Sequence, residues 1–190
     1  MTAADDEVVA GAKQGDPAAW RALYRAHAGR LVVWLSTRPV ADTAVSADDL
    51  AAEAWLTAAE KIGSFHGTSS DFAGWLFGIA RKLGANAHRR GLRRGTRPTD
   101  PVALPDPPAV AGPEAACVAD AWVLELLGTL PTREREVVAC REVVGLDVAA
   151  TASALGISSA SVRVAHHRAL RRLSTRLGAQ LGSSERSAAR

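Results

Sequence analysis

The sequence predicts an all-α protein built from two small helical domains. Apolar residues recur at three- and four-residue steps over long stretches, whereas the alternating runs that form strands are hard to find. Residues 91–113 hold six of the nine prolines and show no sustained apolar periodicity, which predicts a flexible linker. We therefore expect a first domain at 1–90, the linker at 91–113, a second domain at 114–178 and a disordered tail at 179–190.

The charges of the chain fall in blocks that its net charge of +3 conceals. Residues 1–60 sum to −4, residues 61–99 to +7, residues 100–136 to −5 and residues 137–190 to +5. Basic blocks suit a polyanion, and acidic blocks suit a basic protein surface or simple solvation. Two basic blocks, each on the polar side of a helix, favour a polyanionic partner.

Cysteine and histidine usage argues against a metal site or cofactor. Cys117 and Cys140 form no CxxC motif, and no histidine stands at metal-ligand spacing, so we expect neither a disulfide framework nor zinc. Met1–Asp6 lacks the features of a signal peptide, and no apolar run approaches about eighteen residues. We expect a cytoplasmic protein without membrane contact.

Two helices are predicted early in the first domain. Asp16-Pro17 is a strong helix start, and the apolar positions after it define one buried face: Trp20, Leu23, Tyr24, His27, Leu31, Trp34 and Leu35. A second helix is predicted from Ser46, because Ser46 and Asp49 have capping-box spacing. Its apolar side includes Leu50 and Ala54, and its acidic side consists of Asp48, Asp49, Glu53 and Glu60.

A Gly/Ser loop and a cationic helix complete the first domain. The loop KIGSFHGTSSDF precedes apolar positions that continue at helical spacing from Phe72 to Ala87. No acidic residue occurs between Asp71 and Asp100, which is the charge pattern that phosphate binding requires. The polar face ends in Arg81, Lys82, Asn86, His88, Arg89 and Arg90.

The second domain has the element order of a helix-turn-helix. Helices are predicted over 114–127 and from 131 to Val144, then over 147–154, a turn at 155–158, and a longer cationic helix from Ser159 to about Leu177. The first turns of such a helix contact base edges, and later arginines bind phosphate. The base-contacting candidates are Ser159, Ala160, Ser161, Arg163, Val164 and His167, and the phosphate candidates are Arg168, Arg171 and Arg172.

The chain resembles the extracytoplasmic-function sigma factors, the small two-domain members of the bacterial sigma-70 family. The resemblance rests on the order and spacing of several segments: Gly15-Asp16 with Trp20, Leu23 and Tyr24; Asp49-Leu50 with Glu53 and Leu56; Phe65-His66-Gly67, Phe72, Trp75-Leu76, Ile79-Ala80-Arg81 and Arg89-Arg90; then Leu130-Pro131, Arg135, Gly145-Leu146, Ala152, Leu155-Gly156 and Val162. It departs from the family pattern at Ala52, Lys82, Asn86, Ala150-Thr151, Ala165 and His166.

The resemblance implies a non-enzymatic protein that binds core RNA polymerase, directs it to promoter DNA and helps to separate the strands. It implies core-polymerase contacts at Asp49, Leu50, Glu53 and Leu56. It implies −10 element contacts at Phe65, His66, Gly67, Ser69, Arg81, Lys82, Asn86, Arg89 and Arg90. It implies −35 element contacts at Ser159, Ser161, Arg163, Val164, His167, Arg168 and Arg171. An anti-sigma factor is the implied regulator.

Two other functions remain open from sequence. A stand-alone helix-turn-helix regulator would need only the second domain and leaves the acidic helix and residues 65–90 unexplained. A nuclease using Asp48, Asp49 and Glu53 is disfavoured, because these acids lack histidine partners and a glycine-rich phosphate loop. For a sigma factor, we expect the linker to let the two domains fold together before polymerase holds them apart.

Overall fold

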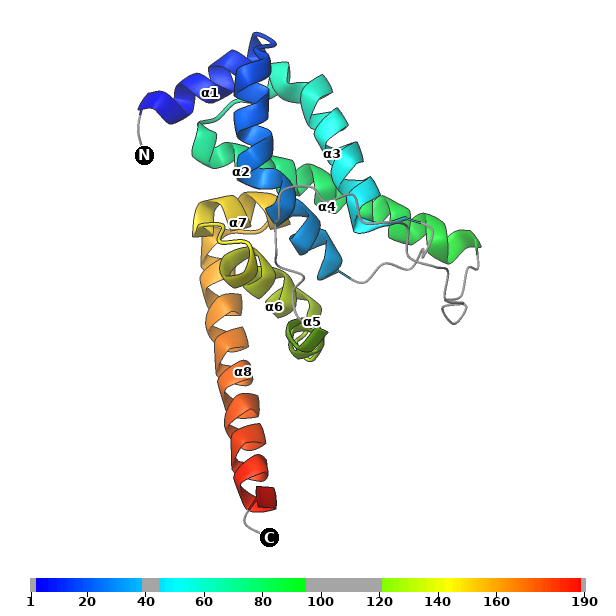
Figure 1. The fold of residues 1–190 in the computed structure, drawn as a ribbon, viewed down its shortest axis with the longest axis vertical. Helices are drawn as coiled ribbons and strands as arrows, with labels where there is room; N and C mark the ends of the chain where they lie inside the picture. The colour runs from blue at the N-terminus through cyan, green and yellow to red at the C-terminus, as the bar shows by residue number, and fades with distance from the viewer. Residues whose placement is uncertain (1–2, 39–44, 95–120, 189–190) are drawn as a thin grey trace.

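The computed structural model describes residues 3–38, 45–94 and 121–188, which form eight α-helices and no strand (Figure 1). The prediction of an all-α fold is confirmed for this part of the chain. The first half contains α1 (Ala3–Lys13), α2 (Pro17–Ser36), α3 (Ala47–Lys61) and α4 (Ser69–Arg94), with the 3₁₀ turn η1 (Ile62–Ser64) before α4. The second half contains α5 (Ala121–Gly128), α6 (Thr132–Val138), the π turn η2 (Ala139–Val143), α7 (Val148–Leu155) and α8 (Ser159–Ala188).

The helices of the first half begin at the predicted capping residues. Asp16 caps α2 by accepting hydrogen bonds from the amides of Ala18 and Ala19, and Pro17 occupies the first helical position. Ser46 and Asp49 form a reciprocal capping box at the start of α3. These caps satisfy amides that have no partner within the helix, so they fix where each helix starts.

Local hydrogen bonds also define the second half. The Arg135 side chain donates to the carbonyls of Leu127, Gly128 and Leu130, and thereby joins the end of α5 to α6. Asp147 caps α7 through the amide of Ala150 at 2.7 Å. The turn between α7 and α8 passes through Gly156 at φ +64°, a backbone conformation that favours glycine.

Several boundaries differ from the sequence predictions. The helix α4 continues to Arg94, past the predicted linker start at Gly91, and α8 continues to Ala188 instead of ending near Leu177. Isolated glycines such as Gly91 and Gly178 cost a helix only about 1 kcal/mol each, so neighbouring helix formers carry the helix through them. The other residues of the predicted linker, 95–113, lie outside the described residues.

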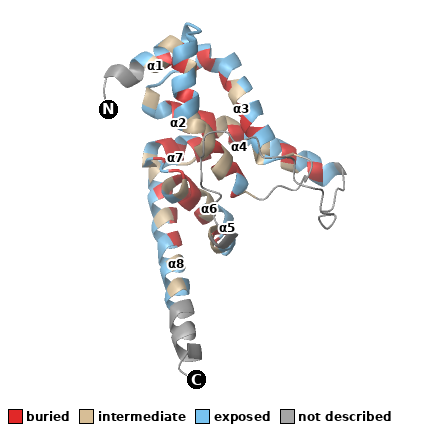
Figure 2. Cartoon of the chain, viewed as in Figure 1, coloured by how far each residue is buried: buried red, intermediate tan, exposed pale blue. Residues whose placement is uncertain are grey.

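The two halves pack directly against each other through α4 and α7 (Figure 1). On α4, Gly74 faces the backbone of α7: a Cβ atom at this position would lie 2.8 Å from the Ala150 carbonyl oxygen. One turn later, Gly78 faces the Ser153 and Ala154 carbonyl groups. The two glycines let the helices approach to backbone contact, and residues of both halves share one hydrophobic core (Figure 2).

Charged side chains on α2 and just after its end reinforce this junction. The Arg30 side chain donates to the Val144 carbonyl at 2.6 Å, where η2 ends. Arg38 forms an ion pair of 2.7 Å with Glu136 of α6 and lies 4.7 Å from the centroid of the Trp34 ring. The contact between the halves is therefore apolar at its centre and polar at its edge.

We predict that Gly74→Ala loosens the contact between the two halves. Its Cβ would overlap the α7 backbone, which cannot move aside as a flexible side chain can, so the free energy of unfolding should fall by about 1–3 kcal/mol. The matched control is Gly84→Ala on the same helix, where the nearest atom, Leu50 Cδ1, is 3.9 Å away. This control should be neutral or stabilising in chemical denaturation, because alanine is the better helix former. Equal effects of the two substitutions would contradict the packing.

His27 lies partly buried on the inner side of α2. Its ring centroid is 5.7 Å from that of Phe72 on α4. Burial and, to a smaller extent, the positive charge of Arg30 together lower the pKa of His27 to about 4. The folded chain therefore holds this imidazole neutral at pH values where the unfolded chain protonates it.

We predict that His27 makes the fold sensitive to acid. Because its folded pKa is below its unfolded value of about 6.5, its contribution is constant above pH 6.5 and stability falls as the pH drops toward 4. The loss should be on the order of 2 kcal/mol, allowing for partial exposure. Urea denaturation between pH 7 and pH 4 should show a shallower decline for His27→Gln. Parallel pH profiles would contradict the prediction.

Candidate nucleic-acid and partner surfaces

The loop between α3 and α4 is held by Asp71 in the first turn of α4. The Asp71 carboxylate accepts hydrogen bonds from the Thr68 amide at 2.9 Å and from the Thr68 hydroxyl at 2.8 Å. Within the loop, a Cβ atom on Gly67 would lie 2.8 Å from Phe65 Cζ and 2.9 Å from Asp71 Cβ. The loop therefore has a defined shape that requires glycine at position 67.

The aromatic part of this loop faces inward. Phe65 is buried, and its ring centroid lies 4.9 Å from that of Trp75 and 6.0 Å from that of Phe72. His66 is exposed, and its Nδ1 atom lies 2.8 Å from the Ser64 carbonyl oxygen. Of the predicted loop contacts, His66 and Gly67 are exposed and Ser69 is half-buried, whereas Phe65 is buried and packs against the core.

The cationic residues of α4 differ in exposure. Lys82, Arg89 and Arg90 are exposed, as is Asn86, whose side-chain oxygen accepts a hydrogen bond from Arg89 at 2.6 Å. Arg81 is half-buried beside the second half of the chain, and its Nη2 atom would lie 3.1 Å from a Cβ at Gly156. The packing of α7 on α4 therefore leaves most of this cationic face open but partly covers Arg81.

The predicted acidic helix, α3, presents a mixed surface. Glu53 and Leu56 are exposed, Leu56 to 67%. Asp49 is exposed, and its carboxylate accepts hydrogen bonds from the Ser46 hydroxyl and the Ser46 amide. These two bonds lower the pKa of Asp49, the bond from the hydroxyl more strongly. Leu50 is 2% exposed and belongs to the core, so it holds α3 in place and cannot contact a partner in this arrangement.

An apolar groove beside α3 was missed by the sequence analysis. It has a volume of about 720 Å³ and runs between α2 and α3. Tyr24 and Trp55 line it with ring centroids 5.2 Å apart, and Leu56 forms part of its edge. The expectation that Tyr24 is buried was wrong, because this side chain is 55% exposed. The spacing of apolar residues placed Tyr24 near the buried stripe of α2, but it could not show that the neighbouring helices leave this side chain uncovered.

The helix α8 exposes most of its predicted DNA-contacting residues. Arg163, Val164, His167, Arg168 and Arg171 are exposed, whereas Ser159 and Ser161 are half-buried at the start of the helix. The opposite side of α8 buries Val162, Ala165 and Ala169. Ser158 caps the helix, because its hydroxyl oxygen accepts a hydrogen bond from the Ser161 amide at 3.2 Å. The exposed face is thus separated cleanly from the buried one.

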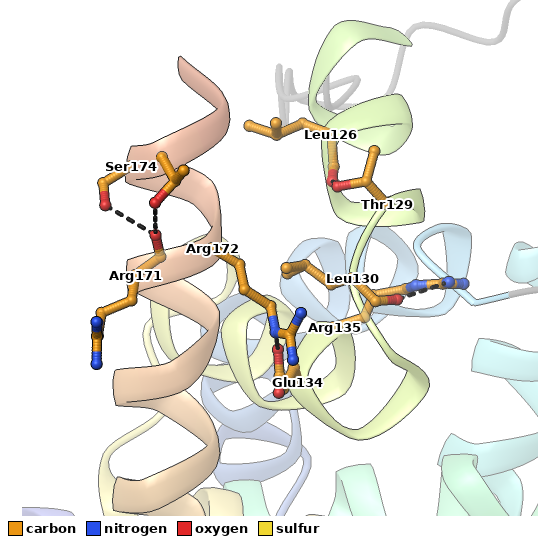
Figure 3. Close-up of polar contacts among 9 residues, drawn as sticks. Leu126, Thr129, Leu130, Glu134, Arg135, Arg171, Arg172 and Ser174 are labelled. Carbon is orange, nitrogen blue, oxygen red and sulfur yellow. Dashed lines mark hydrogen bonds and ion pairs between the residues drawn. The ribbon is translucent and has the colours of Figure 1, made fainter. Parts of the chain in front are cut away.

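An ion pair and a hydrogen bond fix α8 against the elements before it. Arg172 binds Glu134 of α6 with an Nε to Oε2 distance of 3.0 Å (Figure 3). His166 lies 2.7 Å from the Glu142 carboxylate on η2. His166, one of the departures from the family pattern, therefore has an acidic partner, which the sequence pattern did not indicate.

Sequence comparisons match both halves of this arrangement. The sigma-70 region 2 family matches residues 23–95, and the sigma-70, region 4 family matches residues 120–173. The ECF RNA polymerase sigma factor SigD of Mycobacterium tuberculosis (strain ATCC 25618 / H37Rv) is 37% identical over 174 residues, which are 88% of this chain and 81% of SigD. The chain belongs to the ECF sigma factors of the sigma-70 family. It is an RNA polymerase sigma factor that directs promoter-specific transcription.

Other relatives of this sigma factor agree with the assignment. ShbA of Streptomyces griseus, also an ECF RNA polymerase sigma factor, is 34% identical over 131 residues, 66% of this chain and 69% of ShbA. Among solved structures, CnrH in complex with the cytosolic domain of CnrY has a TM-score of 0.62 at 24% identity. That match covers 93% of this chain and 98% of CnrH, so it supports the fold.

The resemblance predicted from the sequence is confirmed at the level of family and function. The region 2 match also accounts for the first half of the chain, which a stand-alone helix-turn-helix regulator leaves unexplained. Among the described residues, no group of three or more His, Cys, Asp or Glu side chains could hold a metal ion. Within the described helices, none alone has the length and apolar character to cross a membrane; only α7 with the first part of α8, bent by 101° at their junction, meets both conditions.

We predict that Gly67→Ala weakens the binding of the sigma factor, assembled with core polymerase, to single-stranded −10 DNA. The added methyl group must displace Phe65 or Asp71 and so change the shape of the loop, which should reduce affinity tenfold or more, as measured by fluorescence anisotropy. The control is Gly63→Ala at the start of the same loop, where a Cβ meets nothing within 4 Å. If both variants bind like the wild type, the shape of this loop does not serve DNA binding.

Proposed function

We propose that this sigma factor uses three separate surfaces for its three macromolecular contacts. The groove and the acidic face at α2 and α3 bind core polymerase, the loop and α4 bind the −10 element, and the exposed face of α8 binds the −35 element. The observation that carries the proposal is that each of these faces combines exposed charge with a shape fixed by the core. No catalytic residue is required, because strand separation is driven by binding energy.

The polymerase surface combines an apolar groove with acidic residues. Tyr24, Trp55 and Leu56 supply the apolar contact area, and Asp48 also lines the groove, as do the basic residues Arg21 and Arg25. Glu53 is exposed on the same helix. Aromatic and aliphatic side chains at the centre of an interface commonly contribute most of its affinity, while surrounding charges set its orientation. The structure thus supports a larger polymerase surface than the acidic face predicted from the sequence.

The promoter surfaces require the two halves of the chain to separate. The packing of α7 on α4 places the −35 domain directly against the −10 helix. One turn of B-DNA spans about 34 Å, and two promoter elements about two turns apart cannot both be reached from that arrangement. We propose that polymerase binding separates the halves and uncovers Arg81. Because the arginines of α8 are exposed in the packed form, we propose that the contact restrains the protein by limiting its reach on DNA and not by hiding its positive charge.

A protein partner that holds the sigma factor inactive is a further part of the proposal. CnrH, which shares this fold, was solved in complex with the cytosolic domain of a second protein. A corresponding anti-sigma factor for this chain would bind the packed form and oppose its separation. The site of action would be the cytoplasm, where polymerase and promoter DNA are found.

In vitro transcription tests the proposed function. Core polymerase with this sigma factor should produce discrete transcripts from fragmented genomic DNA, and sequencing their start sites should reveal a shared pair of upstream elements. Core polymerase alone should produce none of them. Failure of an active, folded preparation to produce specific transcripts would contradict the proposal.

We predict that Glu53→Lys and Leu56→Ala each weaken association with core polymerase, by about tenfold for the charge reversal. Both side chains are exposed, and neither caps the helix as Asp49 does. Biolayer interferometry with immobilised core polymerase measures the effect, and Glu7→Lys on α1 is the control. Wild-type affinity in both α3 variants would remove this helix from the interface.

A further inference from the structure

Val164 is an exposed apolar residue on the otherwise polar DNA-contacting face of α8. Its side chain is 50% exposed and stands between exposed Arg163 and exposed His167 and Arg168. A single exposed valine on a protein surface is common and needs no explanation. This one, however, lines a hollow between α6 and α8 with a volume of about 380 Å³.

The residues that line the hollow are mainly apolar or basic. Pro131, Ala160, Val164 and Ala165 supply apolar surface, and the exposed residues Arg133 and Arg168 supply positive charge. The acidic residue that also lines the hollow, Glu134, is mostly buried and bound to Arg172 at 3.0 Å (Figure 3). Its carboxylate is thereby neutralised, so a polyanion can approach the hollow.

This combination matches one feature of the DNA major groove. Thymine is the base that presents an apolar group there, its C5-methyl, and the phosphates on either side of the groove suit arginine. We propose that the hollow accepts the C5-methyl group of a thymine in the −35 element, with Val164 as its apolar contact. This specificity rests on the proposed binding of α8 to the −35 element and adds the base that the hollow selects.

Replacing thymine by deoxyuridine tests the proposal, because the two bases differ only in this methyl group. The −35 sequence is first obtained by selecting DNA with the assembled holoenzyme. Each thymine in that element is then replaced singly by deoxyuridine, and the affinity of the holoenzyme is measured for wild type and for Val164→Ala. The control variant is Leu170→Ala, which also truncates an exposed apolar side chain of α8 but one outside the hollow.

For one thymine, the wild type and Leu170→Ala should lose about fourfold in affinity on replacement by deoxyuridine, the value expected for burying one methyl group. Val164→Ala should bind the thymine-containing DNA about fourfold more weakly and show no further loss with deoxyuridine.

The proposal is overturned if wild type and Val164→Ala lose the same factor at every thymine, or if no thymine methyl affects the wild type. The hollow would then fit an apolar side chain of a protein partner better than DNA. Selection that returns no −35 preference at all would instead contradict the proposed function of α8, and the inference with it.

Discussion

The close approach of α4 and α7 is the contact on which the arrangement of the whole chain depends. Gly74 and Gly78 bring the α4 backbone against the Ala150, Ser153 and Ala154 segment of α7, with no side chain of α4 between them. This contact places residues of both halves in one large hydrophobic core, beside a smaller cluster within the second half, and Arg30 and Arg38 bind carbonyl and carboxylate groups at its edge. A chain that matches two separate sigma-70 regions is therefore packed as a single body.

This contact uses the same helix that carries the proposed −10 surface. The glycines and Arg81 lie toward α7, while Lys82, Arg89 and Arg90 remain exposed. The packing can therefore hold the two halves together while these cationic side chains stay exposed. It holds α8 near α4 through α7. In the function proposed above, the two promoter elements require these helices to be farther apart, so binding to polymerase and binding to both elements would be coupled through this one helix-to-helix contact.

The sequence was sufficient for the features that depend on local chemistry. Asp16-Pro17, Ser46 with Asp49, and Gly156 each define a helix end through hydrogen bonds to nearby residues, and the structure confirms them. It was insufficient where the burial or pairing of a side chain depends on segments that are distant along the chain. Tyr24 is exposed because no neighbouring helix covers it, Leu50 is buried by the packing of α3, and His166 is paired with Glu142 of another element. Gly74 and Gly78 lie on an ordinary helical pattern, and only the position of α7 explains them.

The central claim is that the two halves are packed in the free sigma factor and separate on core polymerase. Single-molecule energy transfer tests it most directly, with dyes on cysteines introduced at the exposed positions Ser36, at the end of α2, and Glu125 of α5, and with Cys117 replaced by serine. The account predicts one high-transfer population for the free protein and a low-transfer population with saturating core polymerase. Gly74→Ala should populate the low-transfer state without polymerase. An unchanged transfer efficiency on saturating core polymerase would contradict the account.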